Sequence, residues 1–158
     1  MSTVICRQPN LADVSALAQI RARDWGDEDY WRERISGYLR GERHPQHALK
    51  QRVIFLAEDK GVLVGFIAGH LTRRHNFDGE LQWINVLPEY QRRGIASQLF
   101  RQLAEWLSAQ NADRVCVDVS PGNSSAREFY KRHGAEDLNE HWLVWPDIKR
   151  VFPHQVDP

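Results

Sequence analysis

The sequence predicts a single α/β (or α+β) domain in which helices cover one layer of mixed β-sheet. The chain has 158 residues, which is close to the usual size of one domain. Its predicted elements run β-α-α-β-β-β-α-β-α-β, which gives four helices and six strands, or seven strands if the last element is a strand pair. A hydrophobic content of 42%, with 6 Trp and 6 Phe, supplies a core and excludes a disordered chain. We expect the domain to span residues 3–148 and a C-terminal tail to span residues 149–158. The segment after Pro146 is polar, so we expect it to be loosely packed.

The first elements are a strand and two helices. Residues 3–7 are short, apolar and β-branched, as in a strand. Apolar residues at helical spacing follow, and Asn10 or Asp13 can cap that helix. Residues 27–40 repeat the helical pattern, and Gly41 is a plausible end.

Three strands of one sheet come next. Residues 42–51 have no clear pattern and predict a loop. Residues 52–58 and 62–71 are apolar runs joined by a Gly-containing turn, so they predict a hairpin. Residues 80–86 form the next strand, which ends before Pro88 because proline cannot donate to a sheet.

The second half alternates helices and strands. Gly94 opens a strongly amphipathic helix, and residues 115–119 form a short strand in which only Asp118 is polar. Residues 124–133 predict a short helix. A final strand or strand pair falls within residues 136–145.

Charge and composition exclude several classes of protein. Lys+Arg and Asp+Glu both count 21, so no global basic field points to nucleic acid. No apolar run reaches the ~20 residues that span a bilayer, and the N-terminus has no signal-peptide pattern. Cys6 and Cys116 are too few for a disulfide scaffold and suggest reduced core thiols. We therefore expect a cytoplasmic protein with no nucleic-acid or membrane partner.

The segment Gln91-Arg92-Arg93-Gly94-Ile95-Ala96 carries the clearest chemical signal, because it joins a strand to a helix N-terminus. The free N–H groups of a first helical turn and two arginines suit a phosphate. The spacing matches neither the G-x-x-x-x-G-K-[ST] nor the G-x-G-x-x-G motif, which disfavours nucleotide triphosphatases and dinucleotide dehydrogenases. Taken alone, the segment could equally be a solvated helix cap.

This hexapeptide resembles the Q/R-x-x-G-x-G/A motif of the GNAT superfamily of acyl-CoA N-acyltransferases, with Ala96 where the final Gly is commonest. Asn123, Ala126, Tyr130 and Gly134 resemble the next strand–loop–helix unit of the same family. The two motifs are in register, and the resemblance covers about residues 3–148. It implies a GNAT fold whose fourth and fifth strands splay into a cleft.

The resemblance also implies acetyl-CoA as the acyl donor and no metal. Backbone N–H groups of residues 92–96 would hold the pyrophosphate, and residues 85–87 would pair with the pantetheine arm. The implied cofactor-binding residues are Asn85, Val86, Leu87, Gln91, Arg92, Arg93, Gly94, Ile95, Ala96, Asn123 and Tyr130.

Acetyl transfer to an amine requires a base, because a primary amine is mostly protonated at neutral pH. Glu80 is the first candidate and Asp118 the second, since each resembles a base position within the superfamily. Glu80 could instead be a solvated strand end, and Asp118 a buried, paired carboxylate. Tyr130 resembles the family acid that meets the CoA sulfur, although an aromatic residue there could simply pack in the core.

The acceptor is expected across residues 24–50. Trp25, Tyr30 and Trp31 lie there beside acidic residues, a combination that suits a cationic amine. The acids equally suit a helix first turn, and the aromatics a core. We treat Cys116 as a core residue and the His44/His47 pair as a surface pair rather than a metal site.

The sequence thus predicts an N-acetyltransferase that transfers acetyl directly to a primary amine in a ternary complex, a small amine being favoured. A protein N-terminal or lysine acetyltransferase and a non-catalytic acyl-CoA sensor are the alternatives. The partners would be acetyl-CoA and the amine, and the protein a monomer or homodimer.

Overall fold

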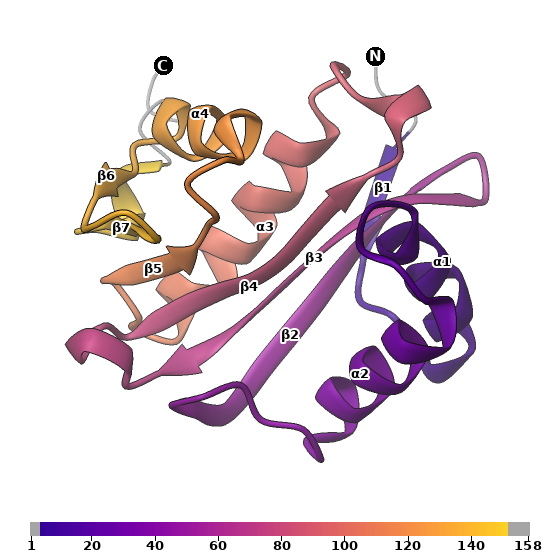
Figure 1. Ribbon diagram of the computed structural model, residues 1–158, viewed down its shortest axis with the longest axis horizontal. Coiled ribbons are helices and arrows are strands. Elements are labelled where there is room, and N and C mark those ends of the chain that lie inside the picture. The colour runs from indigo at the N-terminus through magenta and orange to yellow at the C-terminus, as the bar shows by residue number, and fades with distance from the viewer. Residues whose placement is uncertain (1–3, 152–158) are drawn as a thin grey trace.

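One mixed sheet runs through the molecule, shown in Figure 1 as a computed structural model that describes residues 4–151. Over these residues the sheet has seven strands in the order β1-β2-β3-β4-β5-β7-β6. Neighbours pair antiparallel except β4 and β5, which are parallel. The strands are β1 (Val4–Arg7), β2 (Ala48–Asp59), β3 (Val62–Thr72), β4 (Gly79–Val86), β5 (Val115–Asp118), β6 (Glu136–Asp137) and β7 (Trp142–Trp145). The predicted mixed sheet is confirmed.

Helices cover both faces of this sheet. Over residues 4–151 they are α1 (Val14–Trp25), α2 (Glu28–Arg40), α3 (Ile95–Ala109) and α4 (Ser124–Arg132), with 3-10 turns η1 (Leu11–Asp13), η2 (Arg74–Asn76), η3 (Pro88–Tyr90) and η4 (Ile148–Val151). The pair α1 and α2 lies on one face, and α3 and α4 on the other (Figure 1). Consecutive strand residues serve opposite cores: Phe66 packs under α1 and α2, and Ile67 under α3. No helix in the described range is long and apolar enough to cross a membrane.

Local sequence signals set several element ends as expected. The Asp27 side chain accepts a hydrogen bond from the Tyr30 N–H at 3.2 Å and caps α2. Gly41 ends that helix in the left-handed conformation, with φ 74°. The β2–β3 hairpin turns at Lys60 and Gly61, both at positive φ, the backbone that tight hairpin turns require.

One segment differs from the sequence prediction. Strand β2 begins at Ala48, inside the segment 42–51 that was expected to be a loop, because Ala48 pairs with Thr72 across a register shift. The last unit is a pair of antiparallel strands, β6 with β7, which is one of the two forms that the sequence predicts. The first predicted strand also included residue 3, which lies outside the described residues.

The expectation that the chain packs loosely after Pro146 is wrong for the turn η4. Ile148 has no exposed surface, and its N–H donates to the Asp113 carbonyl at 2.7 Å. Val151 packs on the same core as α3. Ile148 and Val151 are three residues apart, so one turn brings both to the core. The polar residues beside them made the segment resemble a polar tail in the sequence. The rest of the predicted tail, residues 152–158, lies outside the described range.

The feature that positions the site is the divergence of β4 from β5. The two strands pair only where Gly79–Leu81 lies beside Val115–Val117. Strand β4 then continues to Val86, whereas β5 ends at Asp118 and the chain leaves toward α4. A register shift in the β3–β4 pairing also leaves Gln82 without a partner residue in β3. The diverging strands open a cleft in the middle of the sheet.

Candidate active site

The N-terminus of α3 is shaped by two residues in the left-handed conformation, Arg92 with φ 65° and Gly94 with φ 80°. Side chains cap the N-termini of α2 and α4, through Asp27 and Asn123, but no side chain caps α3. Its first-turn N–H groups therefore remain available to a ligand, at the positive end of the helix dipole.

A cavity of about 570 Å³ lies at this N-terminus, between the end of β4 and α4. We call it the α3 cavity. It is lined by Ile84, Asn85, Val86, Tyr90, Gln91, Arg92, Gly94, Ile95, Ala96, Ser97, Asn123, Ser125, Ala126, Glu128, Phe129, Tyr130 and Arg132. Most of the predicted cofactor residues thus line one cavity.

Two predicted cofactor residues are not among those that line the α3 cavity. Leu87 packs against the core under α1 and α2, and its N–H donates to the Val64 carbonyl at 2.8 Å. The Arg93 guanidinium lies over the Tyr90 ring, 5.0 Å from its centre.

A second cavity, of about 620 Å³, occupies the opening between β4 and β5, and we call it the cleft cavity. It is lined by Arg21, Asp24, Trp25, Gln82, Trp83, Ile84, Asn85, Val117, Asp118, Val119, Ser120, Asn123, Ala126, Tyr130 and His141. The residues that line both cavities define their junction: Ile84, Asn85, Asn123, Ala126 and Tyr130. A ligand in one cavity can therefore meet a ligand in the other at this junction.

Tyr130 stands at the junction and is 5% exposed. Burial raises the pKa of its phenol, and the positive charge of Arg21 offsets part of that rise. The phenol is therefore protonated at neutral pH and can act as a hydrogen-bond donor. Asn123, from the same motif, caps α4 by accepting from the Ala126 N–H at 3.2 Å.

Asp118 is the last residue of β5, and its side chain is exposed. This explains how a carboxylate can end an otherwise apolar strand without the cost of burial. Asp118 lines the cleft cavity and also a neighbouring cavity of about 580 Å³ beside Glu140 and Trp142.

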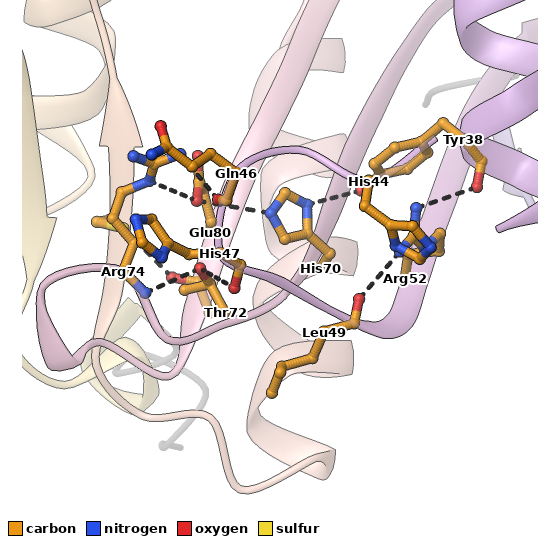
Figure 2. Close-up of polar contacts among 12 residues, drawn as sticks. Tyr38, His44, Gln46, His47, Leu49, Arg52, His70, Thr72, Arg74 and Glu80 are labelled. Atoms are coloured by element: carbon orange, nitrogen blue, oxygen red, sulfur yellow. Dashed lines mark hydrogen bonds and ion pairs between the residues drawn. The ribbon is translucent and has the colours of Figure 1, made fainter. Parts of the chain in front are cut away.

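Glu80 lies elsewhere, at the start of β4, and is only 4% exposed. Figure 2 shows its surroundings: Arg74 Nε donates to Glu80 Oε1 at 3.1 Å, and His70 Nε2 lies 3.5 Å from the same oxygen. His70 Nδ1 lies 3.0 Å from the Tyr38 hydroxyl on its other side. Glu80 does not line the α3 cavity or the cleft cavity. Its carboxylate instead links β4 to β3 through His70 and to η2 through Arg74.

The predicted acceptor residues separate in the structure. Trp25 lines the cleft cavity and is 52% exposed. Trp31 is buried under the sheet, and its indole N–H donates to the Trp25 carbonyl at 3.1 Å. Tyr30 packs edge-on against Trp31 and lines neither the cleft nor the α3 cavity.

The surroundings of Cys116 and His44 agree with structural rather than catalytic roles. Cys116 is fully buried, and burial raises the pKa of its thiol, so a thiolate is disfavoured there. His44 Nδ1 lies 2.7 Å from a guanidinium nitrogen of Arg52.

Sequence reasoning did not single out Arg21 as a functional residue. It falls on the apolar face of α1, and in the structure it lines the cleft cavity and donates to Asn85 at 2.7 Å. The available signal was a charged residue at a core-facing position of an amphipathic helix.

Comparison with known proteins adds sequence and structural relatives. The chain is 28% identical, over an alignment of 169 positions, to the uncharacterized N-acetyltransferase YuaI of Bacillus subtilis. The alignment covers 94% of this chain and 96% of that protein. It is 31% identical over 117 residues to the mycothiol acetyltransferase of Corynebacterium diphtheriae, covering 70% of this chain but only 38% of the relative. The crystal structure of the PaiA N-acetyltransferase of Thermoplasma acidophilum in complex with coenzyme A has the same fold, with a TM-score of 0.71 and 18% identity, over 92% of this chain and 99% of that one.

The family model described as the acetyltransferase (GNAT) family matches residues 15–135. This range holds the α3 N-terminus, both diverging strands and the junction. The chain belongs to the acetyltransferase (GNAT) family.

Proposed function

We propose that this chain transfers the acetyl group of acetyl-CoA to a primary amine, by direct attack within a ternary complex. The observation that carries the proposal is the junction of two cavities, one at an uncapped helix N-terminus and one lined by carboxylates. Substrates bound in the two cavities would meet there, as direct transfer requires.

Acetyl-CoA fits the α3 cavity. The pyrophosphate would lie on the N–H groups of residues 92–96, where the helix dipole and the Arg92 guanidinium favour an anion. The pantetheine arm would follow residues 85–87 of the unpaired β4 edge and bring the thioester to the junction. The PaiA structure, which has the same fold, is a complex with coenzyme A, and this supports coenzyme A as the ligand.

Asp118 is the better placed of the two candidate bases, because its carboxylate lines the cleft cavity. The Glu80 carboxylate is buried and bonded to Arg74, away from both cavities. We therefore propose that Asp118 takes the proton from the attacking amine. Tyr130 would donate a hydrogen bond to the CoA sulfur as it leaves.

The acceptor we propose is a small cationic amine. The cleft cavity presents two carboxylates, Asp24 and Asp118, next to the exposed ring of Trp25. Carboxylates attract an ammonium group, and an indole face adds a cation–π contact.

The test is release of CoA thiol from acetyl-CoA over a panel of diamines, amino sugars and short peptides. Turnover with small cationic amines, lost in the Asp118→Asn variant, is the expected result. Binding of acetyl-CoA without turnover on any amine would overturn the proposal in favour of a sensor.

A second candidate, acetylation of a peptide amine, has one observation in its favour. The cleft cavity adjoins two more: one shares Asp118 and His141, and the other, of about 290 Å³, shares Gln82 and Trp83. Such a row of cavities could hold an extended chain. Faster turnover on peptides than on small amines would select this candidate.

A further inference from the structure

Arg21 is a cation held inside the cleft without a matching anion. Its guanidinium lies over two indole rings, 5.1 Å from the centre of Trp25 and 4.8 Å from that of Trp31. Nη1 donates to the Asn85 side-chain oxygen at 2.7 Å. Nε is buried and, among residues 4–151, has no hydrogen-bond partner.

No carboxylate in the described part of the chain forms an ion pair with Arg21. The charge of Asp24 acts on Arg21, and the Asp24 carboxylate also accepts from the amide nitrogen of Asn85 at 3.3 Å. Burial lowers the pKa of Arg21 to about 10, with Tyr130 and then Asp24 opposing the change, so the group stays charged at neutral pH. A buried and incompletely paired cation is costly unless an anion arrives to use it.

The reaction supplies an anion at this place. The amine nitrogen attacks the thioester carbon, the C–N bond forms, and the carbonyl electron pair moves to oxygen. That pair then returns, the C–S bond breaks with its electrons on sulfur, and the amine proton passes to Asp118. The products are the N-acetyl amine and a CoA thiolate, formed at the junction beside Asn85 and Tyr130.

Tyr130 alone is poorly matched to that thiolate. A cysteine-like thiol has a pKa near ~8.5 and a phenol one near ~10, so proton transfer from phenol to thiolate is unfavourable. Burial raises the pKa of Tyr130 further and widens the gap. A hydrogen bond from the phenol helps, but the thiolate needs a positive charge as well.

We propose that Arg21 is a catalytic residue of the acetyl transfer and stabilises the negative charge on the departing CoA sulfur. The assignment rests on the proposed function. It accounts for the burial of the guanidinium, its missing ion-pair partner and its bond to the junction residue Asn85. The sulfur leaves as a thiolate beside the guanidinium and takes its proton later from solvent or through Tyr130.

The test is the ionisation of CoA bound to the enzyme, followed by the ultraviolet absorbance of the thiolate with desulfo-CoA as the blank. Wild type should lower the pKa of the bound thiol, and Arg21→Met should return it toward the value of free CoA. We expect a change of about tenfold or more in proton affinity, which is one pKa unit. The same titration in Tyr130→Phe separates the effect of the phenol on the thiol pKa from that of Arg21. Asp24 is unchanged in every variant, so its charge contributes equally to each titration.

Arg23→Met is the matched control, because Arg23 is an exposed residue of the same helix whose guanidinium lies 3.6 Å from Glu89. It should leave the bound thiol unchanged. Arg21→Gln serves if the methionine variant does not fold. Wild type alone also tests the idea: between the bound and free thiol pKa values, the affinity for CoA over desulfo-CoA should rise with pH.

The failures are distinguishable. If wild type turns over while the bound thiol titrates as free CoA does, or if Arg21→Met titrates and reacts like wild type, Arg21 has no catalytic role. If acetyl-CoA and CoA do not bind the wild-type protein, the proposed function itself fails.

Discussion

The two cavities are built in different ways. The α3 cavity takes more than half of its lining residues from one continuous segment, residues 84–97, which includes the uncapped N-terminus of α3. The cleft cavity gathers side chains from α1, β4, β5, α4 and the turn before β7. The α3 cavity is therefore set by local backbone conformation, whereas the cleft depends on side chains brought together by the whole fold. Substitutions in the cleft cavity should therefore change kcat and the use of the acceptor. Substitutions in the α3 cavity should change the affinity for acetyl-CoA.

The largest effect should come from the cleft, with Asp118→Asn. Loss of a positioned base lowers kcat by about 10²–10⁴-fold. The Km for acetyl-CoA should change little, because Asp118 does not line the α3 cavity. Steady-state kinetics with both substrates varied measure the two effects separately.

Glu80→Gln is the paired control for that change. It removes a buried charge from Arg74 and His70 and should lower the free energy of unfolding by about 1–3 kcal/mol while kcat falls far less. A large loss of kcat in Glu80→Gln, with Asp118→Asn active, would assign the base to Glu80 instead.

Tyr130→Phe should have the next largest effect, at the junction of the two regions. Losing one donor to the leaving sulfur lowers kcat by about tenfold to a hundredfold. Stability should hold, because phenylalanine keeps the edge contact with Trp145, whose ring centre lies 5.7 Å away. Chemical denaturation accompanies the rate measurement, and full activity would leave Tyr130 as a packing residue.

The same contrast explains what could be predicted from the sequence. Most of the elements and several of their ends follow from local signals such as the Asp27 cap, Gly41 and Gly94. The parting of β4 from β5 and the cofactor residues of the α3 cavity were expected only because the motifs resemble those of the GNAT superfamily. Arg21 could not be assigned, because its role appears only when α1 meets Asn85 of β4, 64 residues away. The Glu80 carboxylate is held by Arg74 of η2 and by His70 of the neighbouring strand β3. The spacing of these residues along the chain does not predict that they meet.

A smaller effect is expected on the cofactor side, with Gly94→Ala. Nothing lies within 4 Å of the position of an added Cβ, so the change acts only through φ 80°, which alanine resists. A strain of about 1–3 kcal/mol is relieved by a shift of the α3 N-terminus, and the Kd for acetyl-CoA should rise about fivefold or more. Calorimetric titration measures it.

Gly122→Ala is the control for Gly94→Ala, since that glycine also has open space but no positive φ. It should bind acetyl-CoA as wild type does. Equal affinity in both variants would show that the left-handed backbone at Gly94 is not needed for the cofactor.

The smallest effect concerns His133, which holds the two helices beside the α3 cavity together, with Nε2 3.0 Å from Ser97 Oγ. Burial first, and then Arg132 and Arg101, lower the pKa of His133 below its usual range. The unfolded chain therefore binds the proton more readily, so stability is lost as the pH falls from about 6.5 toward the folded-state pKa. His133→Gln should flatten this part of the curve of Tm against pH, by a few degrees at most. An unchanged slope in the variant would place the acid sensitivity elsewhere.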